Sequence, residues 1–291
     1  MNIGLIDIDK TNFPNLVLMK ISSFYKNLGF NVELYNSEKQ YDLCFASSVF
    51  TYTEKQKLPR NTIIGGTGYK SDNYLPDDIE HICPDYNLYN LNYSIGFLTR
   101  GCPRKCSWCV VPDKEGSIRG NSEYEEFVKH DEVVFLDNNV LACEHGLKQI
   151  EKLGKTKIKV DFNQGLDARL IDVSVVKLLS KLKWRSPLRL ACDSEAMIKP
   201  IHKAVELLRW YNVTPAQYSV YTLIDDINSA LERVKFLKGL KCDPFAQPFR
   251  NFETSEEPAR ELRRFARWVN TKQLFRSMTW EEYQDYRGDR I

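Results

Sequence analysis

The chain has 291 residues, of which 43% are hydrophobic and 27% are charged, and its formal net charge is +2. This composition is typical of a globular protein, and the balanced charge shows no overall bias towards nucleic acid or acidic membranes. The sequence holds no apolar run as long as a membrane-spanning helix and begins without the layout of a signal peptide, so we expect a cytoplasmic protein with no membrane partner.

Alternating strand and helix patterns predict a small, open, Rossmann-like α/β domain over residues 1–85. Apolar runs predict its strands at residues 3–8, 30–34, 41–46 and 62–64. Residues at helical spacing follow the first of these runs, namely Leu18, Ile21, Tyr25 and Leu28. Gly29 stands where the C-terminus of a helix favours a left-handed residue, and the last strand leads into the glycine-rich segment 65–68.

Three cysteines are gathered in the segment Gly101-Cys-Pro-Arg-Lys-Cys-Ser-Trp-Cys109. Cys102, Cys106 and Cys109 lie within eight residues, and the aromatic Trp108 directly precedes the last of them. Three thiolates in one loop can hold three irons of a cubane cluster and leave the fourth iron without a protein ligand. An open coordination position is typical of a reactive centre rather than a structural one.

The Cys-x3-Cys-x2-Cys spacing, with its aromatic residue before the third cysteine, resembles the radical S-adenosylmethionine (radical SAM) superfamily. The resemblance implies a 4Fe-4S cluster whose open iron binds the amino and carboxylate groups of S-adenosyl-L-methionine. It also implies reductive cleavage of that cofactor to a 5′-deoxyadenosyl radical, which abstracts hydrogen from a substrate. An electron donor such as flavodoxin or ferredoxin is implied as well. Methyl transfer, rearrangement, sulfur insertion and oxidation share these motifs, so the substrate and the reaction subtype stay open.

Other readings of the cysteines are a structural zinc site and a disulfide. Zinc needs a fourth ligand, and Cys83, Cys143 and His145 are candidates, although none is paired at zinc-ribbon spacing. A disulfide is disfavoured in a cytoplasmic chain. The remaining cysteines at 44, 192 and 242 lie in or beside strand-like runs and are expected in the core.

Six strand-like runs alternate with helical patterns over residues 93–250, and these lie at 94–98, 133–136, 157–162, 188–192, 218–224 and 241–246. The order predicts a parallel sheet with right-handed crossovers, closed or partly closed into a barrel. It matches the partial (β/α)6 barrel of radical SAM enzymes. The predicted fold class is therefore α/β, with this barrel between the N-terminal domain and a helical C-terminal extension at 251–291.

Polar side chains follow the predicted barrel strands at the end where parallel α/β folds build their sites. By the resemblance, the cofactor-binding residues of these loops are Asp137, Asn138, Asn139, Asn163, Gln164, Arg169, Ser194 and Glu195, together with Trp108 of the cysteine segment. Asp137–Asn139 occupy the place that contacts the methionyl amino group, and Arg169 could hold the methionyl carboxylate in two parallel hydrogen bonds. Helix capping is the alternative role for Asp137, Asp193 and Asp226.

The N-terminal domain resembles a reduced form of the cobalamin-binding domain that precedes many radical SAM barrels. The Asp-x-His-x-x-Gly motif that supplies a cobalt ligand is missing, because Asp7-Ile8-Asp9-Lys10 occupies its place. We therefore expect no cobalamin and interpret the domain as a cap. A cobalamin-dependent radical SAM methyltransferase is the alternative within the family.

The C-terminal extension contains two interleaved sets of residues at helical spacing, an apolar set at 262, 265, 266 and 269 and an arginine set at 260, 263, 264 and 267. They predict one helix with an apolar face on the barrel and a basic face towards solvent. The basic face could bind nucleic acid. The alternative from a different class is thus a non-enzymatic zinc or iron-sulfur protein that binds nucleic acid.

Overall fold

The computed structural model describes the whole chain except residues 72, 186, 214, 216, 252–255 and 286–291. The chain divides into two compact units, each built from separated segments. Unit 1 comprises residues 1–96, 122–133 and 251–255, and unit 2 comprises residues 97–121, 134–250 and 256–291. Both are mixed α/β structures with parallel sheets, which confirms this part of the predicted fold class. The limits 1–85, 93–250 and 251–291 stay predictions, and parts of the last range lie outside the described residues.

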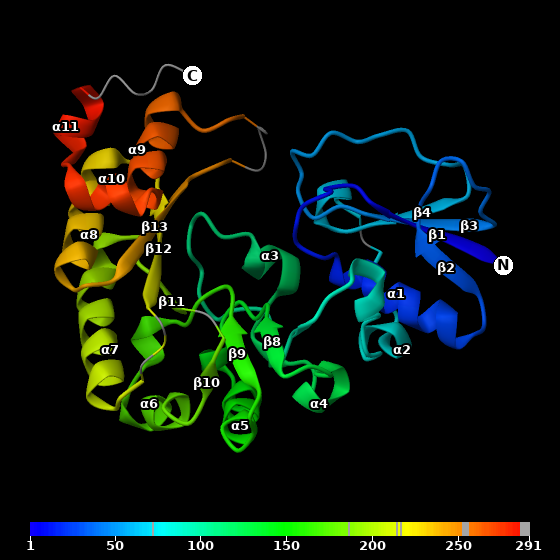
Figure 1. Ribbon diagram of the computed structural model, residues 1–291, viewed down its shortest axis with the longest axis horizontal. Helices are drawn as coiled ribbons and strands as arrows, with labels where there is room; N and C mark the ends of the chain where they lie inside the picture. The colour runs from blue at the N-terminus through cyan, green and yellow to red at the C-terminus, as the bar shows by residue number, and fades with distance from the viewer. Residues whose placement is uncertain (72, 186, 214, 216, 252–255, 286–291) are drawn as a thin grey trace. The chain divides into compact units, whose positions relative to one another are not determined.

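Unit 1 is organised around a parallel four-stranded sheet with the order β2-β1-β3-β4 (Figure 1). Its strands are β1 (Asn2–Asp7), β2 (Asn31–Leu34), β3 (Leu43–Ser47) and β4 (Thr62–Gly65). The helices of this unit are α1 (Leu16–Asn27), α2 (Asp77–Glu80) and α4 (Tyr124–Phe127). Strand β1 lies in the middle of the sheet and pairs in parallel with β2 on one side and with β3 on the other. The sheet therefore has the predicted open, Rossmann-like order.

Helix α1 covers one face of this sheet, and its ends follow from the sequence. Leu18 and Ile21 pack with Ile3 and Leu5 in one buried cluster. The Asn15 side chain caps the helix by accepting a hydrogen bond from the backbone N–H of Leu18. Gly29 has a φ of 81°, which confirms the predicted left-handed residue after the helix.

Two further sheets have the orders β10-β9-β8-β5 and β11-β12-β13. Their strands are β5 (Ser94–Gly96), β8 (Glu132–Phe135), β9 (Lys159–Phe162), β10 (Lys183–Trp184), β11 (Leu188–Ala191), β12 (Tyr218–Ile224) and β13 (Asp243–Pro248). All six predicted strands of residues 93–250 are therefore present. The short β10 is an addition, as are two two-residue strands, β6 (Thr99–Arg100) and β7 (Arg119–Gly120). A parallel bridge between Leu166 and Leu190 links the segment after β9 to β11. The pairings of the described residues do not include closure into a barrel.

The helices of unit 2 follow its strands in the predicted alternation. They are α3 (Val111–Glu115), α5 (Glu144–Leu153), α6 (Val173–Leu179), α7 (Ile198–Trp210), α8 (Ile227–Gly239), α9 (Arg260–Asn270), α10 (Lys272–Ser277) and α11 (Trp280–Asp285). Alternate side chains of β12 are buried, beginning with Tyr218 and ending with Ile224. The other face of this strand is only half-buried, as expected for a sheet that is covered by helices on one side.

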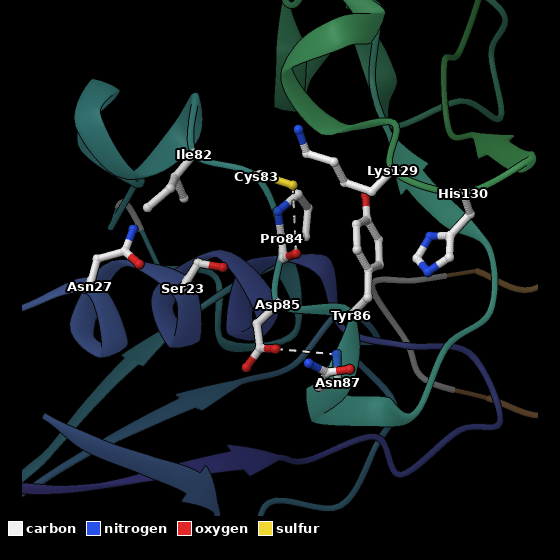
Figure 2. Close-up of a pocket in the computed structure, with 10 residues that line it drawn as sticks. All are labelled: Ser23, Asn27, Ile82, Cys83, Pro84, Asp85, Tyr86, Asn87, Lys129 and His130. Atoms are coloured by element: carbon white, nitrogen blue, oxygen red, sulfur yellow. Dashed lines mark hydrogen bonds between the residues drawn. The ribbon is translucent and has the colours of Figure 1, made fainter. Parts of the chain in front are cut away.

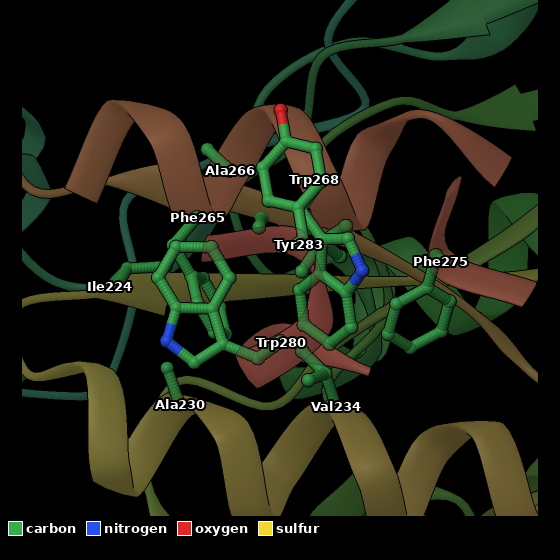
Figure 3. Packing of buried hydrophobic residues seen from close by; sticks show 11 residues of the cluster. Ile224, Ala230, Val234, Phe265, Ala266, Trp268, Phe275, Trp280 and Tyr283 are labelled. Carbon is green, nitrogen blue, oxygen red and sulfur yellow. The ribbon is translucent and has the colours of Figure 1, made fainter. Parts of the chain in front are cut away.

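Helix α9 places its apolar face on the sheet, as its spacing predicts (Figure 3). Phe265 and Trp268 pack edge-on against each other, and both contact the ring of Trp280 in α11. The arginine face is directed away from this core, with Arg263 exposed. Arg264 is used within the fold, because its guanidinium donates hydrogen bonds to the carbonyl groups of residues 283 and 284.

In the sequence, Ser122 and Glu125 have the spacing of a capping box, which predicts the start of a helix there. The capping box before α4 lies one residue later. Glu123 and Glu126 form it instead. Ser122 is buried, and its hydroxyl lies 3.5 Å from Nδ1 of His81, so this side chain is directed away from the start of the helix.

Among the helices of the described residues, none combines the length and the apolar character needed to cross a membrane.

Candidate functional site

The cysteine segment is a loop that leaves the short strand β6 (Thr99–Arg100) and returns through β7 (Arg119–Gly120), which pairs with it antiparallel. Its entry depends on Gly101, whose φ is 82°. A Cβ atom at this position would lie 2.4 Å from the carbonyl oxygen of Ser117. The loop therefore closes tightly before Cys102, and only glycine permits that approach.

Asp137 fixes the start of the loop. This residue follows β8 and is 3% exposed, and its carboxylate accepts hydrogen bonds from the backbone N–H groups of Leu98 and Thr99 and from the Thr99 hydroxyl. Burial raises the pKa of Asp137 to about 6, although these hydrogen bonds oppose the increase. In the described structure this carboxylate holds the chain at β6, and its contact with a cofactor stays a prediction.

Glu115 is a second anchor, at the end of α3. Its carboxylate accepts one hydrogen bond from the backbone N–H of Gly101 and one from the side-chain amide of Asn138, each at 2.9 Å. The Arg100 guanidinium lies 3.6 Å from its other oxygen. With 8% of its side chain exposed, Glu115 ties the two sides of the loop together and orients Asn138.

Asp167 anchors the middle of the loop. Its carboxylate accepts hydrogen bonds from Arg104 Nε at 2.9 Å, from Asn139 Nδ2 at 3.2 Å, and from Arg169 Nε and Nη2 at 2.7 and 3.0 Å. Burial alone would raise the pKa of Asp167, but the hydrogen bonds from the two arginines outweigh it and lower the pKa below its usual range. Two of the predicted cofactor-binding residues, Asn139 and Arg169, thus both donate hydrogen bonds to Asp167. The sequence gave no reason to single out this carboxylate.

The three thiols of the loop are close enough to influence one another. Burial raises the pKa of Cys106 and of Cys109, and the charges of the neighbouring cysteines raise it further. The sulfur of Cys102 accepts hydrogen bonds from the backbone N–H of Arg104 at 3.4 Å and from Asn139 Nδ2 at 3.6 Å. Within the described part of the chain, no three Cys, His, Asp or Glu side chains are already arranged to hold a metal ion.

Asn139 has one polar atom without a partner among the described residues. The side chain is 3% exposed, and its Nδ2 group is used by Cys102 and Asp167. Its Oδ1 atom is buried and accepts no hydrogen bond there. A buried carbonyl oxygen without a donor costs about 1–3 kcal/mol, so this atom is an unused acceptor on the same side chain that donates to Cys102.

The loop after β9 brings Asn163 and Gln164 to the same end of the strands. The backbone of Asn163 is fixed on both sides, since its N–H donates to the Phe135 carbonyl and its own carbonyl accepts from the Tyr221 hydroxyl, each at 3.0 Å. The following Gln164 is exposed. Gly165 has a φ of 86°, and this turn returns the chain towards β11.

The other predicted residues are less tightly held. Trp108 is half-buried in the turn before Cys109. Ser194 precedes a 3-10 turn that begins at the exposed Glu195, and its side chain does not cap that turn.

Of the three aspartates with a possible capping role, Asp226 caps α8 through the N–H of Ser229, as predicted. Asp137 and Asp193 do not cap helices. Asp193 accepts the backbone N–H of Leu223 at 2.9 Å, and burial raises its pKa. Its charge also contributes to the raised pKa of Cys106, so this carboxylate belongs to the surroundings of the cysteines.

Sequence reasoning gave no role to Arg104, Glu115 or Asp167, and for Asp193 it offered only helix capping. Asp167 could have been found from its position two residues before Arg169, a spacing at which an aspartate often accepts backbone and side-chain hydrogen bonds locally.

An open pocket of about 440 Å³ lies within unit 1 (Figure 2). Cys83, Lys129 and His130 line it. Burial raises the pKa of the Cys83 thiol, while the charge of Lys129 lowers it. Asp85, at the edge of the pocket, is already bound by Ser22 and Lys26. The polar groups of this pocket are thus partly used by the fold, and the cysteine loop remains the stronger candidate site.

All eight cysteines are free thiols, and those at 44, 192 and 242 are buried as predicted. Comparison with protein-family models and with curated proteins gives no match to this chain.

Proposed function

We propose that this chain is a radical SAM enzyme in which Cys102, Cys106 and Cys109 hold a 4Fe-4S cluster. The observation that carries the proposal is the Cys-x3-Cys-x2-Cys loop itself, anchored by the buried carboxylates of Glu115 and Asp167. When bound, the cluster would supply an electron for the reductive cleavage of S-adenosylmethionine and so start hydrogen abstraction from a substrate. That electron comes from a donor such as flavodoxin or ferredoxin.

The strand order supports a partial (β/α)6 barrel. From β8 onwards the strands β8, β9, β11, β12 and β13 follow one another in the chain, with a helical segment between each pair. Strand β10 pairs only with Lys159 and Val160, at the start of β9. Beyond them, the bridge between Leu166 and Leu190 continues the sheet from the segment after β9 to β11. The loops at the carboxyl ends of these strands carry the proposed site.

Asn139 and Arg169 are proposed to bind the methionyl group. The buried Oδ1 of Asn139 can accept a hydrogen bond from an ammonium group. Arg169 uses two of its five side-chain N–H groups on Asp167, and the others can donate to a carboxylate. Exposed Gln164 and Glu195, with Trp108, Asn138, Asn163 and Ser194, would contact the remainder of the cofactor or the substrate.

Unit 1 is proposed to act without cobalamin. The loop at residues 65–68 should lie open if it receives the nucleotide tail of a corrin. Instead, a Cβ atom at Gly66 would lie 2.3 Å from the carbonyl oxygen of Ser48, and one at Gly68 would lie 2.2 Å from its hydroxyl. Asp9 binds that hydroxyl and the backbone N–H of Val49. The glycines are thus explained by close packing on the chain's own loop after β3.

The free cysteines favour a compartment that keeps thiols reduced, and we place the protein in the cytoplasm on this ground.

Anaerobic reconstitution with iron and sulfide tests the proposal. The wild-type protein should bind about four irons per chain and release 5′-deoxyadenosine from S-adenosylmethionine after reduction with dithionite. Cys102→Ala, Cys106→Ala and Cys109→Ala should each lose both properties, whereas Cys143→Ala, a matched change outside the loop, should retain them. Stoichiometric zinc without iron after the same treatment would show that the proposed function is wrong.

A further inference from the structure

We infer that Asp167 is a positioning residue that holds the cysteine loop in the form that receives the cluster. The inference rests on the proposed function, because that function gives the loop its purpose. The contacts that hold the loop do not depend on it. Asp167 itself is not proposed to touch the cluster.

The carboxylate of Asp167 joins three separate segments of unit 2. Arg104 lies in the cysteine loop, Asn139 follows β8, and Arg169 belongs to the segment after β9. Only 5% of the Asp167 side chain is exposed, so water competes little for these hydrogen bonds.

Two short paths lead from Asp167 to the sulfur of Cys102. Arg104 donates through its side chain to Asp167 and through its backbone N–H to Cys102 Sγ. Asn139 uses its side-chain amide for both acceptors. Fixing Arg104 also fixes the backbone between Cys102 and Cys106, because it is the middle residue of that stretch.

A local structural role has to be separated from this one. Asp167 also caps the 3-10 turn Ala168–Leu170 by accepting the backbone N–H of Arg169 at 3.1 Å. Asparagine caps as well as aspartate does, so Asp167→Asn retains the cap and the shape while it removes the charge. Asp172→Asn is the matched control, because Asp172 is an exposed capping residue of α6.

The experiment measures how readily the cysteine loop opens in the full-length protein, before iron is added. Trypsin cleavage after the exposed Lys105 is measured by mass spectrometry, with cleavage after Lys155 as an internal reference. Asp167→Asn should raise the relative rate at Lys105 about tenfold or more, and Arg104→Met should do the same. The double variant Asp167→Asn/Arg104→Met should be cleaved at the same rate as either single variant, since both changes remove the same interaction. Asp167→Glu should restore part of the protection.

Reconstitution adds a second readout. The Asp167→Asn protein should lose iron to a chelator several times faster than the Asp172→Asn protein. Equal cleavage at Lys105 in these two proteins, or additive effects of Asp167→Asn and Arg104→Met, would overturn the inference. If Asp167→Asn fails to fold, Arg104→Met decides the question alone, because that side chain is one-third exposed. If the wild type binds no iron, the proposed function fails, and the cleavage rates still decide whether Asp167 holds the loop.

Discussion

The side-chain amide of Asn139 lies 3.6 Å from the sulfur of Cys102 and donates a hydrogen bond to it. The two residues are 37 positions apart, in the loop after β8 and in the cysteine loop. This contact places the unpartnered Oδ1 of Asn139 beside the first cysteine of the motif. A ligand that donates a hydrogen bond to this atom must therefore lie next to the proposed cluster.

Replacing Asn139 by leucine should reduce the affinity for S-adenosylmethionine while changing stability little. The substitution removes an unpaired buried carbonyl, which stabilises the fold, and the amide that donates to Cys102 and Asp167, which destabilises it. Because these effects oppose each other, we expect the free energy of unfolding to change by about 1 kcal/mol or less. The Kd for the cofactor should rise about tenfold, which corresponds to one lost hydrogen bond to a charged group. Anaerobic equilibrium dialysis of the reconstituted protein measures it, with Asn121→Leu as a control. An unchanged Kd contradicts the role given to Asn139.

Replacing Arg169 by alanine should weaken cofactor binding more strongly. Loss of a charge-assisted pair with a carboxylate costs about 2 kcal/mol, or roughly thirtyfold in Kd. Because Arg169 also binds Asp167, Arg104→Met serves as the comparison that disturbs Asp167 without removing Arg169. Isothermal titration of both variants separates the effects. If Arg169→Ala binds and cleaves the cofactor like wild type, Arg169 does not hold its carboxylate.

Asp137 should make stability depend on pH. Its folded-state pKa of about 6 lies above the ordinary value of 3.8, so the folded protein takes up a proton at a higher pH than the unfolded chain. Asp137 therefore stabilises the fold more as pH falls from 6 towards 4, and this contribution is lost as pH rises through 6. Relative to Asp137→Asn, the wild type should gain up to about 3 kcal/mol between pH 7 and pH 4.

Urea unfolding of the wild type and Asp137→Asn across this range measures the difference, and other titrating groups cancel between the two proteins. At pH 7 the Asp137→Asn protein should already be less stable than the wild type by about 1–3 kcal/mol. The carboxylate accepts from Leu98 with one oxygen and from Thr99 with the other, whereas a side-chain amide has a single oxygen. A stability difference that is constant with pH would show that Asp137 does not titrate in this range.

Two glycines of unit 1 with left-handed backbone should respond differently to alanine. Gly29 has open space around its missing Cβ, so Gly29→Ala should cost only the backbone strain, about 1–2 kcal/mol. Gly66 has a φ of 92° and faces the carbonyl of Ser48, so Gly66→Ala adds a steric clash and should cost about 3 kcal/mol or more. Hydrogen exchange of the β3 amides reports both effects. Equal protection in the two variants would refute the close packing of Gly66 on Ser48.

The sequence predicted regular elements better than the contacts between them. Strand β12 was predicted over the residues that it has, Tyr218–Ile224, because they form one run rich in aromatic and β-branched side chains. Strands β6 and β7 have two residues each and cannot show an alternation. Arg104 and Asp167 are 63 positions apart, and their pairing depends on the turn at Gly165 and the approach of β9 to β11. No local pattern contains that information.

The bridge between Leu166 and Leu190 restricts how the length of the chain can vary near the site. Asp167 and Arg169 follow this bridge directly, in a 3-10 turn that Asp167 caps, so one extra residue between Gly165 and Leu166 would displace them from their present positions. Asp167 and Arg169 would then lose their orientation towards Arg104. An insertion within the exposed turn at 154–157, on the far end of β9, changes no such pairing. Related chains that differ in length should therefore vary at this second turn and keep a constant distance between residues 163 and 167.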